Sequence, residues 1–277
     1  MIVSRFAPSP TGYLHLGHAF AAICAADLAA PDGQFLLRIE DIDQGRCRAE
    51  FEDALIDDLR WLGITWTEPP RRQSAHMADY QNALAQLQSM GLVYKCYLTR
   101  RQLNDIFSAP HGPAADVVFD TDAAIAPAER ERLQASNAPH ALRLRARQAI
   151  AMTGPLFWHD HMAGKQRVDV DHFGDVILGR KEMPTSYHLA VTVDDAAQGV
   201  TDVSRGIDLF TASHVHRLLQ ALLDLPVPRY HHHRLLTDAS GRRFAKRDQS
   251  LTLAHLRAAG HSPADIRRLI AGCRVGA

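Results

Sequence analysis

The feature that most constrains this chain is a turn rich in proline and glycine near its start, with the sequence RFAPSPTGYLHLGH at residues 5–18. Apolar residues predict a strand at 2–6, and the run Ala19–Ala29 predicts a helix after the turn. The first turn of a helix offers free backbone N–H groups and the positive end of the helix dipole, which favour phosphate. His15 and His18 are three residues apart, so they share one face of that turn and can donate hydrogen bonds to a polyphosphate.

The composition is that of an ordinary globular protein with room for a sizeable core. Of 277 residues, 46% are hydrophobic and 22% are charged, which fits one large or two modest domains. No run of about eighteen apolar residues predicts a membrane span, and the start lacks the pattern of a signal peptide. The cysteines Cys24, Cys47, Cys96 and Cys273 are widely scattered and form no disulfide framework. We therefore expect a cytoplasmic protein that does not enter a membrane.

The net charge of zero hides an uneven distribution. Residues 229–277 contain ten Lys or Arg and three Asp or Glu, so they carry +7 and residues 1–228 carry −7. A basic segment of this kind is compatible with a contact to a phosphate backbone. A solvated helical face explains the same charge, and charge alone favours that interpretation.

Strands and helices alternate after the first helix. Gln34–Ile39 predicts a strand that ends in the acidic cluster at 40–43, and such strand ends face the ligand crevice of open α/β sheets. Apolar residues at helical spacing predict a helix over 51–62, followed by Gly63 and a short strand at Ile64–Trp66. This alternation predicts a parallel sheet with right-handed crossovers.

The chain from about residue 74 to 184 breaks this alternation, and we interpret residues 75–184 as a second module inserted into the first. Its stretch Ala141–Arg145 alternates like a strand with one polar face, and Val168–Leu178 is typical of a hairpin. The other expected elements are a helix at Met77–Met90, a strand at Leu92–Tyr97, a helix from Thr99 through Phe107 and a loop over Ala109–Ala128.

The parallel pattern returns at Tyr187. The expected elements are strands at His188–Val193 (ending at Asp194–Asp195), Val200–Val203 and 229–236, a helix over 215–222, and two short helices at the end. The predicted fold class is α/β. A split Rossmann-type parallel sheet forms the catalytic domain from residues 1–74 and 185–240, the α+β module is inserted at 75–184, and 241–277 is a short helical C-terminal tail.

Five motifs resemble, in the same order along about residues 3–250, those of the class I glutamyl-tRNA synthetases. They are RFAPSPTG at 5–12, HLGH at 15–18, RIED at 38–41, PTSYHLA at 184–190 with Asp194–Asp195 after it, and RGIDL at 205–209. A segment similar to the KMSKS signature lies at Arg243–Arg247, with about thirty residues after it, too few for the long anticodon-binding region of full-length enzymes. The chain is therefore similar to the glutamyl-queuosine tRNA(Asp) synthetases, which resemble the catalytic domain alone.

This resemblance implies ATP-dependent activation of L-glutamate to glutamyl-adenylate and transfer of glutamate to the queuosine base of tRNA(Asp), which is a tRNA modification. Positioning and charge neutralisation dominate such chemistry. The implied partners are L-glutamate, ATP with Mg²⁺ as substrate, and the tRNA(Asp) anticodon loop carrying queuosine. No separate motif for gripping queuosine is visible in the sequence, and we expect a monomer because no long apolar patch or heptad stands out.

The resemblance also implies roles for individual residues. Arg5 and Arg205 would pair with carboxylates, Glu40 with the ammonium group, and Tyr187 would donate its hydroxyl. The implied catalytic residues are His15, His18 and Lys246. The implied ATP-binding residues are His15, Gly17, His18, Arg243 and Lys246. The implied glutamate-binding residues are Arg5, Phe6, Ala7, Pro8, Ser9, Glu40, Tyr187 and Arg205.

Two stretches depart from the pattern. In the KMSKS-like segment, Arg243 replaces the first Lys, Ala245 a Ser and Arg247 the last Ser, so positive charge stays but Ser hydrogen bonding is lost. Many of the related enzymes bind zinc through several cysteines, whereas only Cys96 remains here. One thiolate does not make a tetrahedral site, so we predict no structural zinc and no other metal site. Residues 231–233 are consecutive histidines in an expected strand and point to alternate faces, so we interpret them as surface or phosphate-facing residues.

Bland explanations exist for these residues. Two histidines at a helix start can be caps or solvated side chains, and Arg5, Glu40 and Arg205 can form structural salt bridges. The altered KMSKS-like segment also allows a non-catalytic paralogue that binds tRNA or an amino acid. A third possibility is an enzyme that activates glutamate for a carrier other than tRNA.

Overall fold

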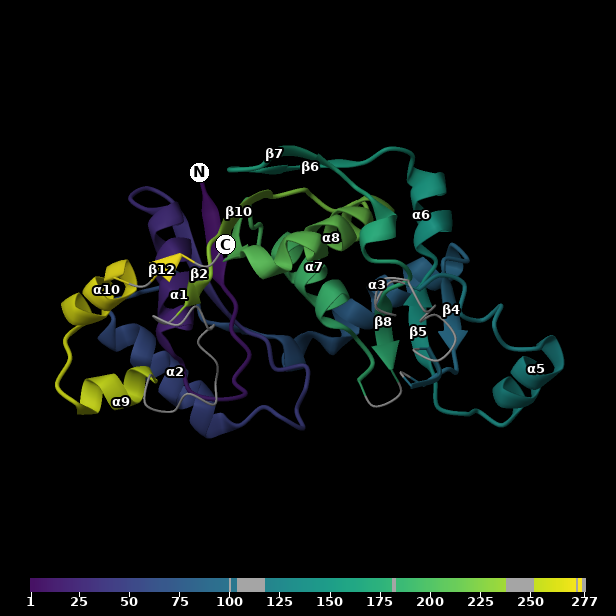
Figure 1. Ribbon diagram of the computed structural model, residues 1–277, viewed down its shortest axis with the longest axis horizontal. Coiled ribbons are helices and arrows are strands. Elements are labelled where there is room, and N and C mark those ends of the chain that lie inside the picture. The colour runs from purple at the N-terminus through teal and green to yellow at the C-terminus, as the bar shows by residue number, and fades with distance from the viewer. Residues whose placement is uncertain (100, 104–117, 181–182, 238–251, 273, 276–277) are drawn as a thin grey trace.

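The computed structural model describes residues 1–99, 101–103, 118–180, 183–237, 252–272 and 274–275 (Figure 1). Of the predicted helix from Thr99 through Phe107, only residues 99 and 101–103 are described. Of the predicted loop over 109–128, only residues 118–128 are described, and they hold turns and the start of a helix at Pro127. The KMSKS-like segment lies wholly outside the described residues. Helices at one end and a small sheet at the other flank the central strands (Figure 1).

A sheet of mainly parallel strands forms the centre of the molecule, and one edge pair in it is antiparallel. One part has the order β1-β2-β3, and another has the order β7-β6-β10-β9. The strands are β1 (Val3–Phe6), β2 (Gln34–Ile39), β3 (Arg71–Arg72), β6 (Phe157–Asp160), β7 (Gly164–Arg167), β9 (Asp202–Gly206) and β10 (Arg229–His233). The backbone N–H of Thr201 donates to the carbonyl oxygen of Val3 at 3.0 Å, so β9 lies directly beside β1. The order β3-β2-β1-β9-β10 puts a topological switch point between β1 and β9, where α/β sheets bind ligands.

Helices cover both faces of this sheet. Along β2, Leu36 packs into one apolar core while Phe35, Leu37 and Ile39 pack into the other, as expected for alternate residues of a strand buried on both sides. The second core includes apolar residues of α1 (Leu16–Ala29), α2 (Ala49–Trp61), α9 (Leu253–Ala258) and α10 (Pro263–Gly272). The first includes residues of α3 (Met77–Ser89), α6 (Ala146–Thr153), α7 (Tyr187–Ala197) and α8 (Phe210–Leu222).

A second sheet lies at the far end of the molecule from α9 and α10 (Figure 1). It is antiparallel with the order β4-β5-β8, from β4 (Val93–Cys96), β5 (Ala141–Leu144) and β8 (Ile177–Arg180). Helix α5 (Pro127–Ala135) extends outward beside it. Within the range that we assign to the inserted module, β6 pairs with β10 of the central sheet at Tyr230 and Asp160. The domain division at 75–184 stays a prediction.

The chain ends in the short helices α9 and α10, as predicted, and a two-residue strand pair, β11 (Leu236–Thr237) with β12 (Arg274–Val275). Short 3₁₀ turns lie at Gln73–His76, Val170–His172 and Ile207–Leu209. The α/β class and the Rossmann-type parallel sheet predicted from the sequence are confirmed. None of the described helices is long and apolar enough to cross a membrane.

Helix α7 is the main correction to the sequence-based expectation. The predicted strand His188–Val193 is wrong, because these residues lie inside α7. Ser186 caps this helix by accepting a hydrogen bond from the backbone N–H of Leu189 at 3.4 Å. The run is mainly apolar, and Leu189–Thr192 are all buried, so its pattern does not distinguish a strand from a buried helix. Asp194 and Asp195 therefore sit on the last turn of a helix rather than at the end of a strand.

Smaller corrections concern the strands. Ile64–Trp66 is not a strand, and the parallel partner of β2 is β3, with Arg38 opposite Arg71. Val168–Leu178 is not a hairpin, since it holds a 3₁₀ turn and the start of β8. The hairpin lies earlier, at β6 and β7, where Asp160 accepts hydrogen bonds from the backbone N–H groups of Met162 and Ala163.

Candidate active site at the carboxyl ends of the central strands

The HLGH stretch forms the start of α1 after the turn that follows β1. His15 is the N-cap residue, and its Nδ1 accepts the backbone N–H of Gly17 at 3.1 Å. His18 Nδ1 accepts the backbone N–H of His15 at 3.3 Å, which completes a reciprocal capping box. Because each Nδ1 is an acceptor, each neutral imidazole carries its proton on Nε2. The capping interpretation is thus confirmed, and it fixes both rings with an N–H donor at the outer nitrogen.

Residue 17 must be a glycine because the imidazole ring of His15 lies directly against its Cα. A Cβ at residue 17 would lie 2.9 Å from Cε1 of His15, a distance that a side chain cannot adopt without moving the ring. The two imidazoles pack against each other with ring centroids 3.9 Å apart. Thr252 forms an antiparallel bridge with His15, and the backbone N–H of Leu253 donates to Leu14 at 2.8 Å. The chain after the KMSKS-like segment therefore returns directly to the HLGH stretch.

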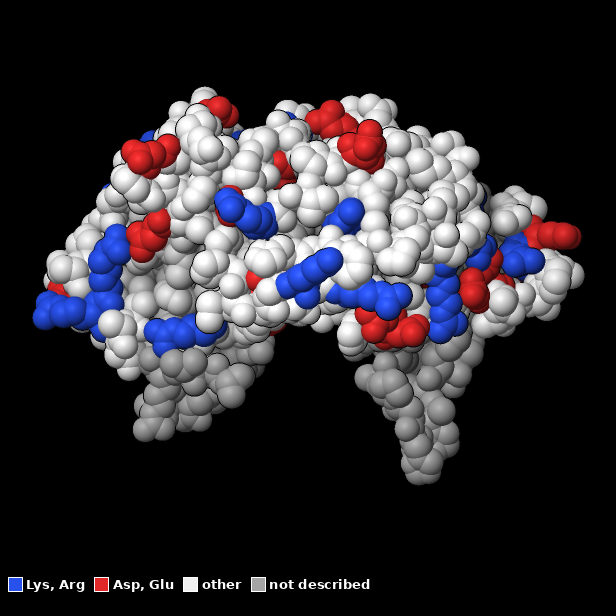
Figure 2. Space-filling view, turned by 90° about the horizontal axis from the view of Figure 1, so that it is seen from above, with Lys and Arg blue, Asp and Glu red and all other residues white. Residues whose placement is uncertain are grey.

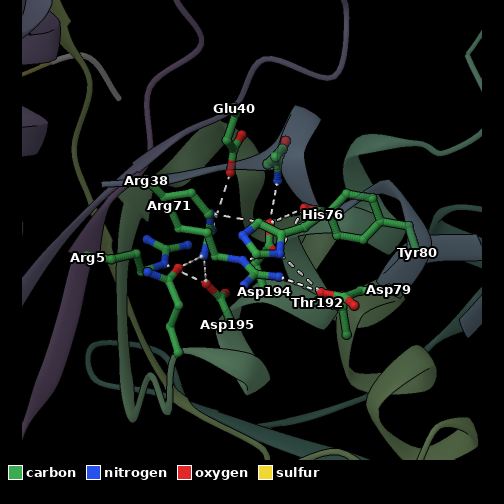
Figure 3. Close-up of polar contacts among 12 residues, drawn as sticks. Arg5, Arg38, Glu40, Arg71, His76, Asp79, Tyr80, Thr192, Asp194 and Asp195 are labelled. Atoms are coloured by element: carbon green, nitrogen blue, oxygen red, sulfur yellow. Dashed lines mark hydrogen bonds and ion pairs between the residues drawn. The ribbon is translucent and has the colours of Figure 1, made fainter. Parts of the chain in front are cut away.

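Buried ion pairs join β1, β2 and α7 beside this stretch (Figure 3). Asp195 Oδ1 accepts hydrogen bonds from Arg5 Nε at 3.0 Å and from Arg38 Nη1 at 2.8 Å. Arg38 also pairs with Glu40 at 3.3 Å and is completely buried. Burial raises the pKa of Asp195, but Arg5 and Arg38 more than offset this and hold the pKa at about 2. Asp195 is therefore a permanent anion that neutralises two guanidinium groups.

Glu40 has the opposite balance. Its carboxylate lies 8% exposed at the end of β2, and burial raises its pKa despite the nearby charges of Arg38 and Arg5. A carboxylate with that environment gains from any further cation that reaches it. The predicted partner of Glu40 is the substrate ammonium group.

Asp194, the neighbour of Asp195, turns toward α3 and fixes the position of α7. Its carboxylate accepts hydrogen bonds from Arg71 Nε at 2.7 Å, Gln73 Nε2 at 2.8 Å and the Tyr80 hydroxyl at 2.9 Å (Figure 3). The side chain is fully buried, and each of its hydrogen bonds comes from outside α7. These contacts fix the position of α7, and with it the position of Tyr187 in the first turn of this helix.

Arg205 is the least compensated charge of the site. It lies on β9, is 5% exposed, and its Nη1 contacts His216 Nδ1 at 3.0 Å and Ser213 Oγ at 3.5 Å. Its Nε and Nη2 are buried and have no hydrogen-bond partner among the described residues. No carboxylate of the described part of the chain forms an ion pair with it. A buried, unpaired guanidinium edge marks a place where an anion is expected.

Tyr187 stands between these groups at the start of α7. Burial raises the pKa of Tyr187. The positive charge of Arg205 lowers this pKa, and the negative charge of Glu40 raises it. The hydroxyl is therefore a hydrogen-bond donor at neutral pH. On the other side of this helix start, Thr185, Ser186 and His188 line a cavity of about 870 Å³ that extends to Arg143 and Asp175 of the second sheet.

The other residues predicted for glutamate binding are Phe6, at the end of β1, and Ala7, Pro8 and Ser9 in the turn that follows. Phe6 and Pro8 are buried, Ala7 is half-buried and Ser9 is exposed. The carbonyl oxygen of Pro8 accepts the backbone N–H of Glu40 at 3.0 Å, which brings the ends of β1 and β2 together. Arg243 and Lys246 lie outside the described residues.

The histidines at 231–233 have separate partners. His231 Nε2 contacts Asp202 at 3.0 Å, and His233 Nδ1 contacts the carbonyl oxygen of Arg234 at 2.9 Å. The expectation that all three are surface or phosphate-facing is wrong for His232, which is 7% exposed and contacts Asp160 at 2.7 Å. Within the described residues, no group of three His, Cys, Asp or Glu could hold a metal ion.

Three contributors were not singled out from the sequence as parts of this site: Arg38, Asp195 and His216. Arg38 belongs to the RIED motif and Asp195 follows the PTSYHLA motif, but the resemblance assigns neither a role in the site. A charge within an apolar strand, as at Arg38, is a signal for a buried ion pair. Asp195 is 157 residues from Arg38, and His216 is 11 residues from Arg205 on another element. No local pattern links such partners.

Comparisons with known proteins agree with this arrangement. Residues 1–276 match the family of tRNA synthetases class I (E and Q), catalytic domain. The glutamyl-Q tRNA(Asp) synthetase of Rhodobacter capsulatus is 49% identical, over 97% of this chain and 99% of that protein. The glutamyl-Q tRNA(Asp) synthetase of Nocardia farcinica is 40% identical, over 96% of this chain and 82% of that protein.

A solved structure shows the same fold. The crystal structure of a glutamate tRNA ligase from Elizabethkingia meningosepticum in complex with its amino acid superposes with a TM-score of 0.74 at 25% identity. The match covers 90% of this chain and 52% of that chain, so the present sequence spans about half of the larger enzyme. From the family match over residues 1–276 and the identity to these relatives, the chain belongs to the class I tRNA synthetases of the E and Q type, in the group of the glutamyl-Q tRNA(Asp) synthetases.

Proposed function

We propose that this protein activates L-glutamate with ATP to glutamyl-adenylate and transfers the glutamate to the queuosine base of tRNA(Asp). The observation that carries the proposal is the buried, unpaired Nε–Nη2 edge of Arg205 at the switch point of the sheet, with Glu40 and Tyr187 beside it. Glutamate brings two carboxylates and one ammonium group, and this site offers a guanidinium, a carboxylate and a hydroxyl. The relatives named glutamyl-Q tRNA(Asp) synthetase support the choice of acceptor.

The substrate contacts follow from charge. One glutamate carboxylate binds the Nε–Nη2 edge of Arg205 in a bidentate manner. Glu40 receives the ammonium group, and Tyr187 donates its hydroxyl to a substrate oxygen. Arg5 adds positive potential, although Asp195 and the carbonyl oxygen of Ser204 already occupy two of its donors.

Phe6, at the end of β1, and the turn Ala7, Pro8 and Ser9 after it shape this pocket. The carbonyl oxygen of Pro8 joins it to Glu40.

In the activation step, an oxygen of the free carboxylate attacks the α-phosphorus of ATP, a P–O bond forms, and the bond to pyrophosphate breaks. His15 and His18 donate Nε2–H groups to the phosphates at the start of α1, and Gly17 lets them pack together. Mg²⁺ enters with ATP as part of the substrate. Lys246 and Arg243 are proposed to neutralise the migrating charge, because Thr252, six residues after Lys246, bridges to His15.

The tRNA contact is proposed on the face shown in Figure 2, where Asp and Glu side chains also lie among the Lys and Arg. A row of Lys and Arg side chains crosses the face shown in Figure 2. Such a row favours a phosphate backbone irrespective of sequence. A tRNA substrate also fits a cytoplasmic protein, and the described cysteines Cys24, Cys47 and Cys96 are all unpaired. We infer that the protein acts as a monomer.

We also propose that the inserted module folds without zinc. Cys96 is buried, and its Sγ accepts a hydrogen bond from the Thr121 hydroxyl at 3.1 Å. That hydroxyl also contacts Tyr94, which donates to Asp175 at 2.9 Å. The thiol of Cys96, the one zinc-ligand cysteine that this chain retains, is thus engaged in hydrogen bonding. Metal analysis of the purified protein tests the proposal, and the expected result is a zinc content well below one per chain.

The decisive experiment incubates the protein with ATP, labelled glutamate and tRNA(Asp) with or without queuosine. Label is expected only on the queuosine-containing tRNA(Asp), and label on unmodified tRNA(Asp) or on tRNA(Glu) contradicts the proposal. Arg205→Ala should abolish glutamate-dependent pyrophosphate exchange. Arg217→Ala is the matched control, because Arg217 lies on α8 and donates to the carbonyl oxygen of Phe157, away from the switch point.

His18→Ala tests the phosphate-binding role. It removes the ring that caps His15 and one Nε2–H donor, so it should abolish activation while the fold stays intact, because a lost cap costs only about 1 kcal/mol. Pyrophosphate exchange and far-ultraviolet circular dichroism measure the two effects. Survival of activation in this variant would show that HLGH is not the catalytic centre.

A further inference from the structure

A row of buried hydrogen bonds lies behind Arg205, on the side away from its unpaired edge. His216 on α8 contacts Arg205 Nη1 through Nδ1 at 3.0 Å, and its Nε2 contacts Nδ1 of His188 at 3.2 Å. His216 is 1% exposed. Neither His216 nor His188 is part of the substrate contacts proposed above.

The protons of this row can be assigned from its chemistry. A guanidinium nitrogen only donates, so His216 Nδ1 must be the acceptor and its proton lies on Nε2. That proton is donated to Nδ1 of His188, whose own proton is then on Nε2. Burial, and next the charge of Arg205, lower the pKa of His216 well below its ordinary value and that of His188 to about 4. Both rings are neutral at physiological pH.

The orientation of Arg205 follows from this contact. In a guanidinium, Nε and Nη2 present two parallel N–H groups on one edge, and this edge binds a carboxylate in a bidentate manner. His216 and Ser213 hold Nη1 from behind, and Ser213 is itself held by His232, which contacts Asp160 at 2.7 Å. The Nε and Nη2 atoms are the ones left without a partner in the described part of the chain.

Because the partner of Arg205 is the neutral imidazole of His216, the positive charge of Arg205 is not neutralised. Arg5 and Arg38 are both neutralised by Asp195 at 3.0 Å or less. Arg205 is held instead by a neutral acceptor, so its full positive charge remains for an incoming anion. A carboxylate at residue 216 would make the same hydrogen bond but would cancel that charge.

We propose that His216 is a positioning residue that fixes Arg205 through Nη1 and keeps its Nε–Nη2 edge charged and turned toward the substrate carboxylate. This inference rests on the proposed function, in which Arg205 binds glutamate. His216 does not touch the substrate, and its effect is exerted on the binding of glutamate rather than of ATP.

Three substitutions separate the contributions of His216. His216→Phe keeps most of the volume but removes the acceptor, and His216→Asn restores an acceptor oxygen near the position of Nδ1. His216→Asp keeps the acceptor and adds a negative charge. His214→Phe is the matched control, because His214 is also buried on α8 but contacts the backbone N–H of Asp169 instead of Arg205.

The readouts are the KM values for glutamate and ATP in pyrophosphate exchange and the Kd for glutamate by calorimetry. We expect H216F to weaken glutamate binding about tenfold or more, as for the loss of one charged hydrogen bond, with ATP changed less than about twofold. H216N should recover most of this loss, and H216D should bind glutamate as poorly as H216F. H214F should leave both KM values near those of the unmodified protein.

An unchanged glutamate Kd in H216F, or an equal rise in the KM for ATP, overturns the role of His216. If H216F does not fold, H216D decides, because it replaces one buried acceptor by another, and wild-type glutamate affinity in H216D refutes the proposal. Absence of glutamate-dependent exchange in the unmodified protein instead overturns the proposed function. Calorimetry still measures the His216 effect in that case, so the two failures are distinguishable.

Discussion

Asp195 is the residue whose removal should most disturb the site, and the structure allows the effect to be estimated. Its pKa of about 2, against about 3.8 in an unfolded chain, corresponds to about 2.5 kcal/mol of stability. Asp195→Asn also leaves Arg5 and Arg38 buried with less compensation, and breaking a buried pair costs about 3–5 kcal/mol. We therefore expect the variant to lose about 2.5–5 kcal/mol of unfolding free energy at pH 7.

The stability difference between the unmodified protein and Asp195→Asn should depend on pH in one direction. A carboxyl group with a lowered pKa stabilises the folded state above the unfolded pKa, and this contribution is lost as the pH falls. The difference between the unmodified protein and Asp195→Asn should therefore be complete at pH 5 and above and shrink between about pH 4 and pH 2.

Urea unfolding followed by circular dichroism at several pH values measures the difference. Asp57→Asn is the matched control, because Asp57 is a 64% exposed acid on α2 whose loss should change stability by less than about 0.5 kcal/mol. If Asp195→Asn unfolds at the same urea concentration as the control, or if the difference does not depend on pH, the reasoning on the buried ion pairs is refuted.

Two further perturbations test other parts of the fold. Asp58 is fully buried on α2, 3.7 Å from Arg257 of α9, and burial raises its pKa to about 6. A raised carboxyl pKa means that the stability of the folded state falls as the pH rises from about 4 to 6. In urea unfolding, Asp58→Asn should therefore be more stable than the unmodified protein by roughly 2–3 kcal/mol at pH 7 and equally stable below about pH 4. Equal stability of the two proteins at pH 7 contradicts this prediction. Asp175 accepts hydrogen bonds from Tyr94 at 2.9 Å and from the backbone N–H groups of Asp120 and Ala146 at 2.8 Å. Asp175→Asn should cost about 2–3 kcal/mol and speed proteolysis of the inserted module, whereas an unchanged cleavage rate would show that these bonds do not hold it.

The strand–turn–helix at the start could be predicted from the sequence because every signal in it is local. The apolar strand, the Pro/Gly turn and the two histidines follow each other directly, and the structure has β1, the turn and the capped start of α1. Glu40 could be placed as well, because the carboxyl ends of neighbouring parallel strands meet at one edge of the sheet. Helix α1 begins at Leu16, three residues before the predicted start, since His15 itself is the cap.

Helix α7 could not be predicted for a physical reason. Val191, Thr192 and Val193 have high strand propensity, and packing on several sides removes the polar face that would reveal a helix. The tertiary contacts of Asp194 with Arg71 and Tyr80, more than a hundred residues away, fix the helix where local preference does not. Sequence patterns do not predict such contacts, because the partners of Asp194 lie on segments far away in the chain.

Among the described residues of the site, the charges follow one scheme that leaves only the guanidinium of Arg205 available. Arg5 and Arg38 share Asp195, and Arg38 also pairs with Glu40. Arg205 has a neutral imidazole in the place where the others have an acid. Two arginines therefore hold β1, β2 and α7 together, while the third keeps a full charge and a free edge. Because the buried edge of Arg205 is costly without a partner, the site is arranged to gain most from a ligand that brings one carboxylate to that edge and a cation to Glu40.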